Sequence, residues 1–305
     1  MKAVISGATG AVGMALIREL ISESCEVLVL CREGSQRNAD IPEHSLVRRV
    51  DCSLDKMQSF NTDGLGKYDV FYHFAWEGTT GEARNDMYLQ NRNVKHTLDA
   101  VSLAKRLGCD TFIGAGSQAE YGRVEGKLTP QTPAFPENGY GIAKLCASQM
   151  SRVMCESLGM RHIWARILSV YGPNDTQNSM VMSTIRKLRT GEKPSFTKGE
   201  QIWDYLYSGD AAKAFVALAK KGKSGSVYCL GSGDPRPLCE YIKDIGAVVE
   251  PDAPLGIGEV EYAARQVMYL CADITALTED TGFVPQTSFK DGIKETVLWY
   301  DQRNK

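Results

Sequence analysis

Tyr140 and Lys144 are the residues whose types and spacing most directly suggest chemistry. They are four positions apart, so in a helix their side chains lie on one face. A neighbouring ammonium group stabilises a phenolate, which lowers the pKa of a tyrosine from its usual value of about 10. The pair therefore predicts proton exchange with an alcohol or carbonyl oxygen during hydride transfer. Taken alone, the same spacing also fits an ordinary surface helix.

Ser117 is placed to act on the same oxygen. It follows the apolar run 111–114, which predicts a buried strand. A residue just past the carboxyl end of a parallel strand faces the crevice in which open α/β sheets bind ligands. We therefore predict that the Ser117 hydroxyl hydrogen-bonds the reacting oxygen. The alternative is a serine that only forms the turn.

A glycine-rich turn follows the first predicted strand, 3–6, and opens a predicted helix. In a dinucleotide site, the first glycine of such a turn allows the bend and the second lets the backbone approach a pyrophosphate. The third lets the helix pack closely on the strand, and the helix N-terminus attracts the phosphate charge. The alternative is a tight strand-to-helix connection with no ligand. We predict a dinucleotide site at Gly7, Thr9, Gly10, Ala11, Val12 and Gly13.

The end of the second predicted strand bears on the choice of dinucleotide. An acidic residue there would bind the ribose 2′-hydroxyl of NAD, but the position is Cys31. Arg32 follows directly and Arg37 is close behind, and two guanidinium groups can hold a 2′-phosphate. The sequence therefore favours NADP(H), with NAD(H) as the alternative. If the cofactor is NAD(H), the two arginines are solvated charges of a loop.

The elements that position these residues follow an alternating pattern. Strands are predicted at 3–6, 26–31, 46–50, 70–74, 111–114, 162–167 and 226–230, and helices at 12–22, 54–60, 86–107, 140–158, 180–189 and 209–220. Strands separated by helices predict an α/β fold with a doubly wound parallel sheet. We expect a dinucleotide-binding Rossmann domain at 1–170 and a smaller C-terminal substrate-binding lobe at 171–305. The chain is expected to cross back to the sheet around 203–230.

Composition narrows the function classes. The formal net charge of −2 gives no reason to expect nucleic acid or an acidic membrane as a partner. No apolar run approaches the roughly 20 residues of a spanning helix, and the first residues do not resemble a signal peptide, so the cytoplasm is the expected compartment. The nine cysteines form no Cys-x-x-Cys pair and the four histidines are scattered, so no metal site is expected.

Ser117, Tyr140 and Lys144 together resemble the Ser-Tyr-Lys triad of the extended short-chain dehydrogenases/reductases, the sugar-nucleotide epimerase, dehydratase and reductase family. Similar segments cover nearly the whole chain: 73–75, 93–97 with His96 in place of a glycine, 170–173, 204–207 with Asp210, 230–233 and 282–285 with Gly292 and Trp299. The resemblance implies an NAD(P)-dependent oxidoreductase whose tyrosine and lysine also hold the cofactor ribose. It further implies that Asp51 contacts the adenine, and that Cys52, Phe74 and Ala75 lie beside the cofactor.

Departures from the family pattern bear on the reaction. The family's 4,6-dehydratases have an Asp-Glu pair after the residue that matches Ser117, whereas this chain has Gln118 and Ala119. Alanine cannot transfer a proton, so dehydration is not expected. We expect reduction of a 4-keto-6-deoxy sugar nucleotide by NADPH. The alternatives are an NAD-dependent sugar-nucleotide 4-epimerase and, from another class, a non-catalytic NADP-sensing regulator.

The substrate side is less sharply defined. Trp203 stands where many relatives have an arginine that contacts the nucleotide, and Ser169 stands where an asparagine is common. Trp203 either stacks on a base or fills the core of the lobe, and a smaller ketone or aldehyde is the alternative substrate. The long helices 86–107 and 140–158 resemble those that form a dimer seam in similar proteins, which implies a homodimer. The candidate substrate contacts are Trp76, Gln118, Arg166, Asn174, Asn178 and Trp203.

Overall fold

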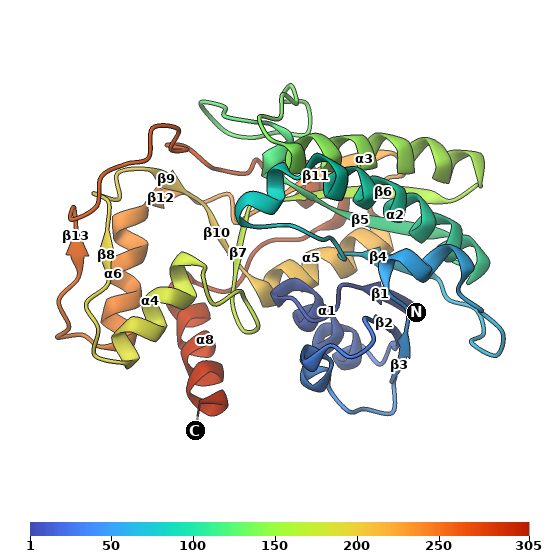
Figure 1. Cartoon of the computed structure of the whole chain (residues 1–305), viewed down its shortest axis with the longest axis horizontal. Helices are drawn as coiled ribbons and strands as arrows, with labels where there is room; N and C mark the ends of the chain where they lie inside the picture. Colours follow the sequence, from blue (N-terminus) through green and yellow to red (C-terminus); the bar gives the residue numbers. More distant parts are fainter. Residues whose placement is uncertain (305) are drawn as a thin grey trace.

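A seven-stranded parallel sheet forms the centre of the molecule in a computed structural model that describes residues 1–304 (Figure 1). Its strand order is β11-β6-β5-β4-β1-β2-β3. The strand order reverses between β1 and β4, and sheets of this kind bind ligands at that point. The α/β prediction is confirmed. The strands are β1 (Lys2–Ser6), β2 (Glu26–Cys31), β3 (Val47–Asp51), β4 (Val70–His73), β5 (Thr111–Ser117), β6 (Arg161–Ile167) and β11 (Ser226–Leu230).

Two helical layers cover the two faces of the sheet. Alternate side chains of the first strand pack against different layers. Ala3 and Ile5 belong to the apolar core that also holds the buried residues of α1 (Ala11–Ser22) and α5 (Ser208–Lys221). Val4, which points to the opposite face, belongs to the core beneath α2 (Met87–Arg106) and α3 (Gly139–Ser157). Both faces of the strand are therefore buried, as its continuous apolar sequence requires.

Short 3₁₀ helices connect several of these elements. They are η1 (Gln36–Asp40), η2 (Leu54–Ser59), η3 (Gly81–Asn85) and η4 (Gln118–Glu120). The sequence predicted an α-helix at 54–60, and η2 replaces it. Met57 is the one fully buried side chain of that turn, with Leu54 and Phe60 packed partly buried against the same core, and the six residues of η2 are too few for a stable helix of their own.

A smaller lobe, on the left of Figure 1, has its own apolar core. Its helices are α4 (Met180–Arg189), α6 (Leu238–Val249) and α8 (Phe289–Arg303). Its short strands pair as β7 (Ser169–Tyr171) with β10 (Tyr205–Tyr207), β9 (Ile202–Trp203) with β12 (Arg236–Pro237), and β8 (Ser195–Phe196) with β13 (Gly256–Ile257). Between these segments the chain returns to the main sheet through α5 and β11, and α7 (Thr275–Thr281) packs beside α5.

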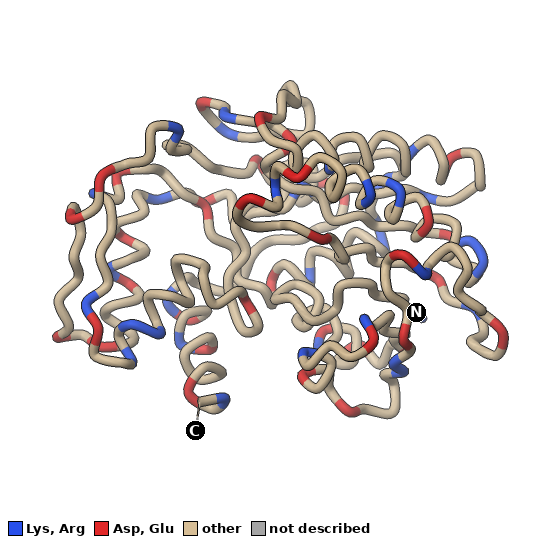
Figure 2. Tube along the Cα trace, viewed as in Figure 1, with Lys and Arg blue, Asp and Glu red and all other residues tan. Residues whose placement is uncertain are grey.

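Charges are interspersed along the whole trace without a long block of one sign (Figure 2). Within residues 1–304, no helix is long and apolar enough to cross a membrane. The same residues contain no group of three or more His, Cys, Asp or Glu side chains placed to hold a metal ion.

Candidate active site

The three glycines of the first turn have different surroundings. A Cβ on Gly7 would lie 2.4 Å from the backbone nitrogen of Ala75, and its φ is +73°. A Cβ on Gly13 would lie 2.6 Å from the carbonyl oxygen of Ala8. Both positions are therefore closed by neighbouring backbone. Gly10 differs, because a Cβ there would meet no atom within 4 Å. Its backbone thus faces open space at the N-terminus of α1, where a pyrophosphate fits.

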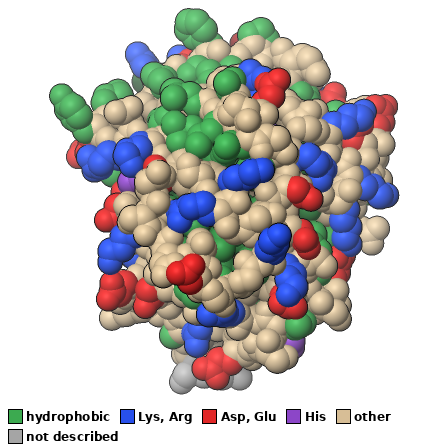
Figure 3. Space-filling view, turned by 90° about the vertical axis from the view of Figure 1, so that its right-hand side faces the viewer, with side chains coloured by type: hydrophobic (Ala, Val, Ile, Leu, Met, Phe, Trp, Pro, Cys, Tyr) green, Lys and Arg blue, Asp and Glu red, His purple; other side chains and the backbone are tan. Residues whose placement is uncertain are grey.

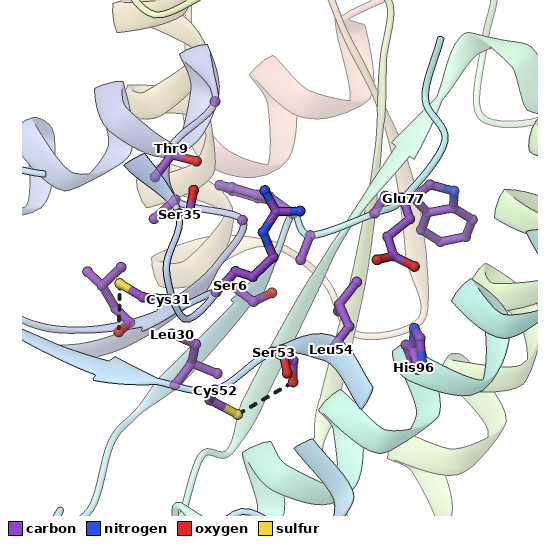
Figure 4. Close-up of a pocket in the computed structure, with 18 of the residues that line it drawn as sticks. Ser6, Thr9, Leu30, Cys31, Ser35, Cys52, Ser53, Leu54, Glu77 and His96 are labelled. Atoms are coloured by element: carbon purple, nitrogen blue, oxygen red, sulfur yellow. Dashed lines mark hydrogen bonds between the residues drawn. The ribbon is translucent and has the colours of Figure 1, made fainter. Parts of the chain in front are cut away.

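A pocket of about 680 Å³ opens at this turn (Figure 4). Its walls come from the ends of β1, β2 and β4, from the segment after β3, and from α2. In Figure 4, Thr9 and Ser35 lie on one side, and Glu77 and His96 face one another on the other. The size and the glycine turn fit a dinucleotide. Of the predicted cofactor contacts, those lining the pocket are Gly7, Thr9, Gly10, Arg32, Arg37, Cys52, Phe74 and Ala75.

Other predicted contacts lie outside this lining. Ala11, Val12 and Gly13 form the first turn of α1, behind Gly10. Asp51 is exposed, whereas the next residue, Cys52, is buried and lines the pocket. Successive side chains of a strand point to opposite sides, which accounts for this difference, and the adenine contact of Asp51 stays a prediction. Lining residues that sequence reasoning missed include Ser35, Asn38, Ser53, Asp55, Arg92 and His96. The i, i+4 spacing of Arg92 and His96 was the available signal for that pair.

The two arginines after β2 have different roles. Arg32 is exposed at the pocket rim, and its carbonyl oxygen accepts a hydrogen bond from the Asn38 side chain at 2.8 Å. Arg37 reaches across the glycine turn and donates to the carbonyl oxygens of Thr9 and Asn174. Asn174 also accepts a bond from Arg18 and is 5% exposed. The substrate contact expected of Asn174 is therefore corrected, because its side chain is held against α1.

The catalytic candidates converge at the ends of β5 and α3. Asn138 caps α3 by accepting a hydrogen bond from the Gly141 amide at 2.9 Å. A Cβ on Gly141 would lie 2.2 Å from the carbonyl oxygen of Ala119, so only glycine lets α3 begin directly against η4. This contact brings Tyr140, on the first turn of α3, next to Ser117 at the end of β5.

Lys144 is held in a buried position behind the tyrosine. Its ammonium donates to the carbonyl oxygen of Ala115 at 2.6 Å and lies 3.8 Å from the ring centre of Trp76. Burial lowers the pKa of Lys144 to about 7, and the negative charge of Glu120 opposes that shift. Among residues 1–304, Lys144 forms no ion pair.

Competing influences set the pKa of Tyr140. Burial, the largest of them, raises it above the ordinary value. Interaction with the Ser117 hydroxyl and the positive charge of Arg84 both lower it, whereas Glu120 raises it. A buried, protonated phenol beside a hydroxyl can donate a proton to a substrate oxygen.

Arg166 does not reach the crevice. It is 3% exposed, and its Nε donates to Oε2 of Glu120 at 2.7 Å. The other carboxylate oxygen of Glu120 accepts bonds from the Ser117 amide at 2.8 Å and from the Trp164 indole at 3.0 Å. The substrate contact expected of Arg166 is therefore wrong. The residue neutralises a fully buried carboxylate beneath Ser117 instead.

The remaining substrate candidates are spread over the crevice and the lobe. Trp203 is half-buried against an apolar cluster that also contains Tyr121 and Cys229 of the main domain, and its indole N–H donates to the Ser169 hydroxyl at 2.9 Å. The two positions that depart from the family pattern thus contact each other. Gln118 is half-buried beside Ser117, and Trp76 lines the dinucleotide pocket. Asn178 is exposed in the turn before α4.

Comparisons with known proteins agree with this arrangement. The family model for the NAD dependent epimerase/dehydratase family matches residues 3–231. The dTDP-glucose 4,6-dehydratase of Neisseria gonorrhoeae is 23% identical over 97% of this chain and 94% of that protein. The Escherichia coli dTDP-glucose 4,6-dehydratase is 28% identical, in a match that spans 57% of this chain and 51% of that protein, about half its length.

Solved structures show the same fold. The UDP-glucuronic acid 4-epimerase of Bacillus cereus in complex with NAD covers 100% of both chains, with a TM-score of 0.84 and 19% identity. RMD from Pseudomonas aeruginosa complexed with NADPH covers 99% of both chains, with a TM-score of 0.80 and 18% identity. From the matched family model, the glycine turn and the Ser117–Tyr140–Lys144 arrangement, the chain belongs to the NAD dependent epimerase/dehydratase family of the extended short-chain dehydrogenases/reductases.

Proposed function

We propose that the chain is an NADP(H)-dependent reductase of a 4-keto-6-deoxy sugar nucleotide. The observation that carries this proposal is the end of β2, where Cys31 and Arg32 line the dinucleotide pocket and no carboxylate occupies the NAD-selective position. A 2′-phosphate would meet the Arg32 guanidinium there. A site selective for NADP(H) suits net reduction, in which the cofactor exchanges at every turnover.

The residues of the site then have distinct tasks. When bound, NADPH supplies the hydride that adds to the ketone carbon. Tyr140 donates a proton to the ketone oxygen, and Ser117 hydrogen-bonds that oxygen. Lys144 would hold the cofactor ribose and would stabilise the tyrosinate that remains.

Dehydration is disfavoured by the same geometry. Ala119 has no proton to transfer, and Gln118 is an amide. The nearest carboxylate, Glu120, is fully buried and bonded to Arg166, Trp164 and the Ser117 amide. It therefore has no free oxygen with which to remove a substrate proton.

The reaction is tested by measuring NADPH oxidation against a panel of 4-keto-6-deoxy sugar nucleotides that differ in base. We expect one NADPH to be consumed for each hydroxyl formed. The nucleotide carried through purification is identified in parallel. Tightly retained NAD, with interconversion at C4 and no net oxidation, would reject the reductase in favour of the 4-epimerase. That second candidate is favoured by the structural likeness to UDP-sugar 4-epimerases.

Replacing Arg32 by alanine tests the cofactor proposal. Loss of one charge-assisted contact to a 2′-phosphate is expected to weaken NADPH binding about 10- to 100-fold, with less than about twofold effect on NADH. Dissociation constants are measured by nicotinamide fluorescence. Arg48→Ala is the matched control, since Arg48 is also exposed but lies on β3, outside the pocket lining. Equal losses of the two dinucleotides for Arg32→Ala would contradict NADP(H) selectivity.

We also propose that the chain forms a homodimer through α2 and α3. An apolar stripe on the outer face of α3 is exposed: Ile142 at 52%, Met150 at 45% and Val153 at 56%, with Cys146 between them. Tyr88, at the start of α2, is 83% exposed. Apolar side chains gather toward the top of Figure 3, the level at which α3 lies in Figure 1. Exposed patches of this kind mark association surfaces.

The cysteines support the cytoplasm as the proposed compartment. All nine are free, and seven of them are buried. Buried thiols without partners behave as small apolar side chains and are typical of a reducing compartment.

A further inference from the structure

Arg84 is a cation beside the candidate acid that sequence reasoning missed. It lies in η3, between β4 and α2, and its guanidinium carbon is 4.4 Å from the ring centre of Tyr140. Its Nη1 donates to the carbonyl oxygen of Thr79 at 3.1 Å. Within residues 1–304, no carboxylate oxygen lies at ion-pair distance from it. The charge of this half-buried group is therefore uncompensated except by the aromatic ring.

The turn that carries Arg84 is fixed against the start of α3. The Gly139 amide donates to the side-chain oxygen of Asn85 at 3.1 Å. A Cβ on Gly139 would lie 3.0 Å from the carbonyl oxygen of Arg84 and 2.8 Å from the sulfur of Met87. The backbone of η3 and the first turn of α3 are thus in direct contact, one residue from Tyr140.

The side chain of Gln90 holds the other end of this segment. Its Nε2 donates to the carbonyl oxygens of Gly78 and Ala83, both at 2.9 Å. Its Oε1 accepts the indole N–H of Trp76 at 2.9 Å, and Gln90 itself is 1% exposed. Trp76 meets the Tyr140 ring edge-on, with the ring centres 6.0 Å apart. One buried amide therefore fixes the Trp76 side chain and the backbone beside Arg84.

Three charged groups lie on the elements packed around Tyr140. Arg84 faces it from η3, and Lys144 lies on its own helix with its ammonium 5.9 Å from the ring centre. Glu120 lies in η4, where it is paired with Arg166. Arg84 lowers the pKa of Tyr140 and Glu120 raises it. Lys144 is bonded to Ala115 and stacked on Trp76. Arg84 is a second cation beside the phenol, and it lies over the ring of Tyr140.

We propose that Arg84 is a positioning residue for the proposed reduction, holding the ring of Tyr140 in place through its guanidinium and stabilising the tyrosinate that forms when the proton is given up. This inference rests on the proposed function, since it assigns Tyr140 as the proton donor. It makes η3 part of the active site, although the segment has no residue of the Ser-Tyr-Lys triad.

The inference is tested with Arg84→Met, which keeps the length of the side chain and removes its charge, and with Arg84→Lys. Arg186→Met is the matched control, because Arg186 is exposed on α4 in the other lobe. The full-length variants are compared in two ways. Tyrosinate absorbance is titrated without substrate, each variant against its Tyr140→Phe partner to isolate one of the 13 tyrosines. The pH profile of kcat is then measured with the best 4-keto sugar nucleotide.

We expect the Tyr140 titration of Arg84→Met to move to higher pH, because a stabilising cation is lost. A proton donor works below its pKa, so the alkaline limb of kcat moves to higher pH as well. The plateau of kcat falls roughly three- to tenfold with the lost cation–π contact. Arg84→Lys should lie between Arg84→Met and the wild type, and Arg186→Met should match the wild type.

Two results would overturn the inference: a Tyr140 titration that stays in place, or a rise in KM with an unchanged pH profile, which would make Arg84 a substrate ligand. Failure of the proposed function is distinguishable from both. If no keto sugar is reduced but the titration still moves, Arg84 acts on Tyr140 as inferred and the assigned reaction is wrong.

Discussion

Replacing Tyr140 by phenylalanine is expected to lower turnover by about 10²- to 10⁴-fold, the range associated with loss of a general acid. The phenyl ring keeps the packing against Trp76 and Arg84, so the fold around it should persist. The affinity for NADPH should change by less than about tenfold, since at most one hydrogen bond to the ribose is lost. Turnover is measured by NADPH oxidation and affinity by nicotinamide fluorescence.

Ser117→Ala serves as the comparison, because it removes a hydrogen bond to the same oxygen but leaves the proton donor in place. It should therefore cost less than Tyr140→Phe. Undiminished turnover in Tyr140→Phe would remove the tyrosine from the mechanism. Dinucleotide binding with no turnover of any keto sugar, in wild type and variant alike, would favour the alternative of a non-catalytic NADP-sensing regulator.

Replacing Arg166 by methionine is expected to lower the free energy of unfolding by about 3–5 kcal/mol. The substitution leaves Glu120 charged at 0% exposure, with only neutral donors from the Ser117 amide and Trp164. The cost arises mainly from burying an unpaired charge. The double variant Glu120→Gln/Arg166→Met should therefore recover part of the loss. Urea unfolding followed by far-UV circular dichroism measures all three proteins.

An exposed ion pair provides the control. Lys2 and Glu26 are 2.9 Å apart with side chains 49% and 52% exposed, so Lys2→Met should cost less than about 1 kcal/mol. A comparably small cost for Arg166→Met would mean that Glu120 finds water or a proton in place of the arginine. A double variant no more stable than the single one would show that the unpaired charge of Glu120 is not the source of the loss.

The parts of the site predicted from sequence are those whose contacts are local. Gly13 meets the backbone of Ala8 within the same turn, so a local contact sets this part of the spacing, whereas Gly7 meets Phe74 and Ala75 just after β4. Tyr140 and Lys144 are fixed by one helix, and Ser117 by the end of the strand that precedes it. The alternation of strands and helices was likewise enough to predict a parallel sheet.

The parts that were missed depend on contacts between distant segments. Arg166 is 46 residues from Glu120, and nothing in the sequence of either strand or turn links the two. A charged residue beside a crevice therefore looked like a ligand when it was half of a buried pair. Asn174 was misassigned for the same reason, since its partners Arg18 and Arg37 lie 156 and 137 residues away. Arg84 lies in a polar segment that packs against Gly139. This segment has no periodic pattern of apolar residues from which that contact could be predicted.

The place of β11 in the main sheet has a consequence for how the chain matures. This strand pairs with β6, and α5 packs on α1. Both β11 and α5 come from residues 208–230, which follow the lobe segments from β7 to β10 in the chain. While the ribosome is still adding residue 200, β6 is an unpaired edge and the apolar side of α1 lacks its cover. A growing chain in that state exposes surfaces that invite aggregation. The main sheet is therefore complete only after β11 has been made, and the lobe segments that precede β11 in the chain are made before it.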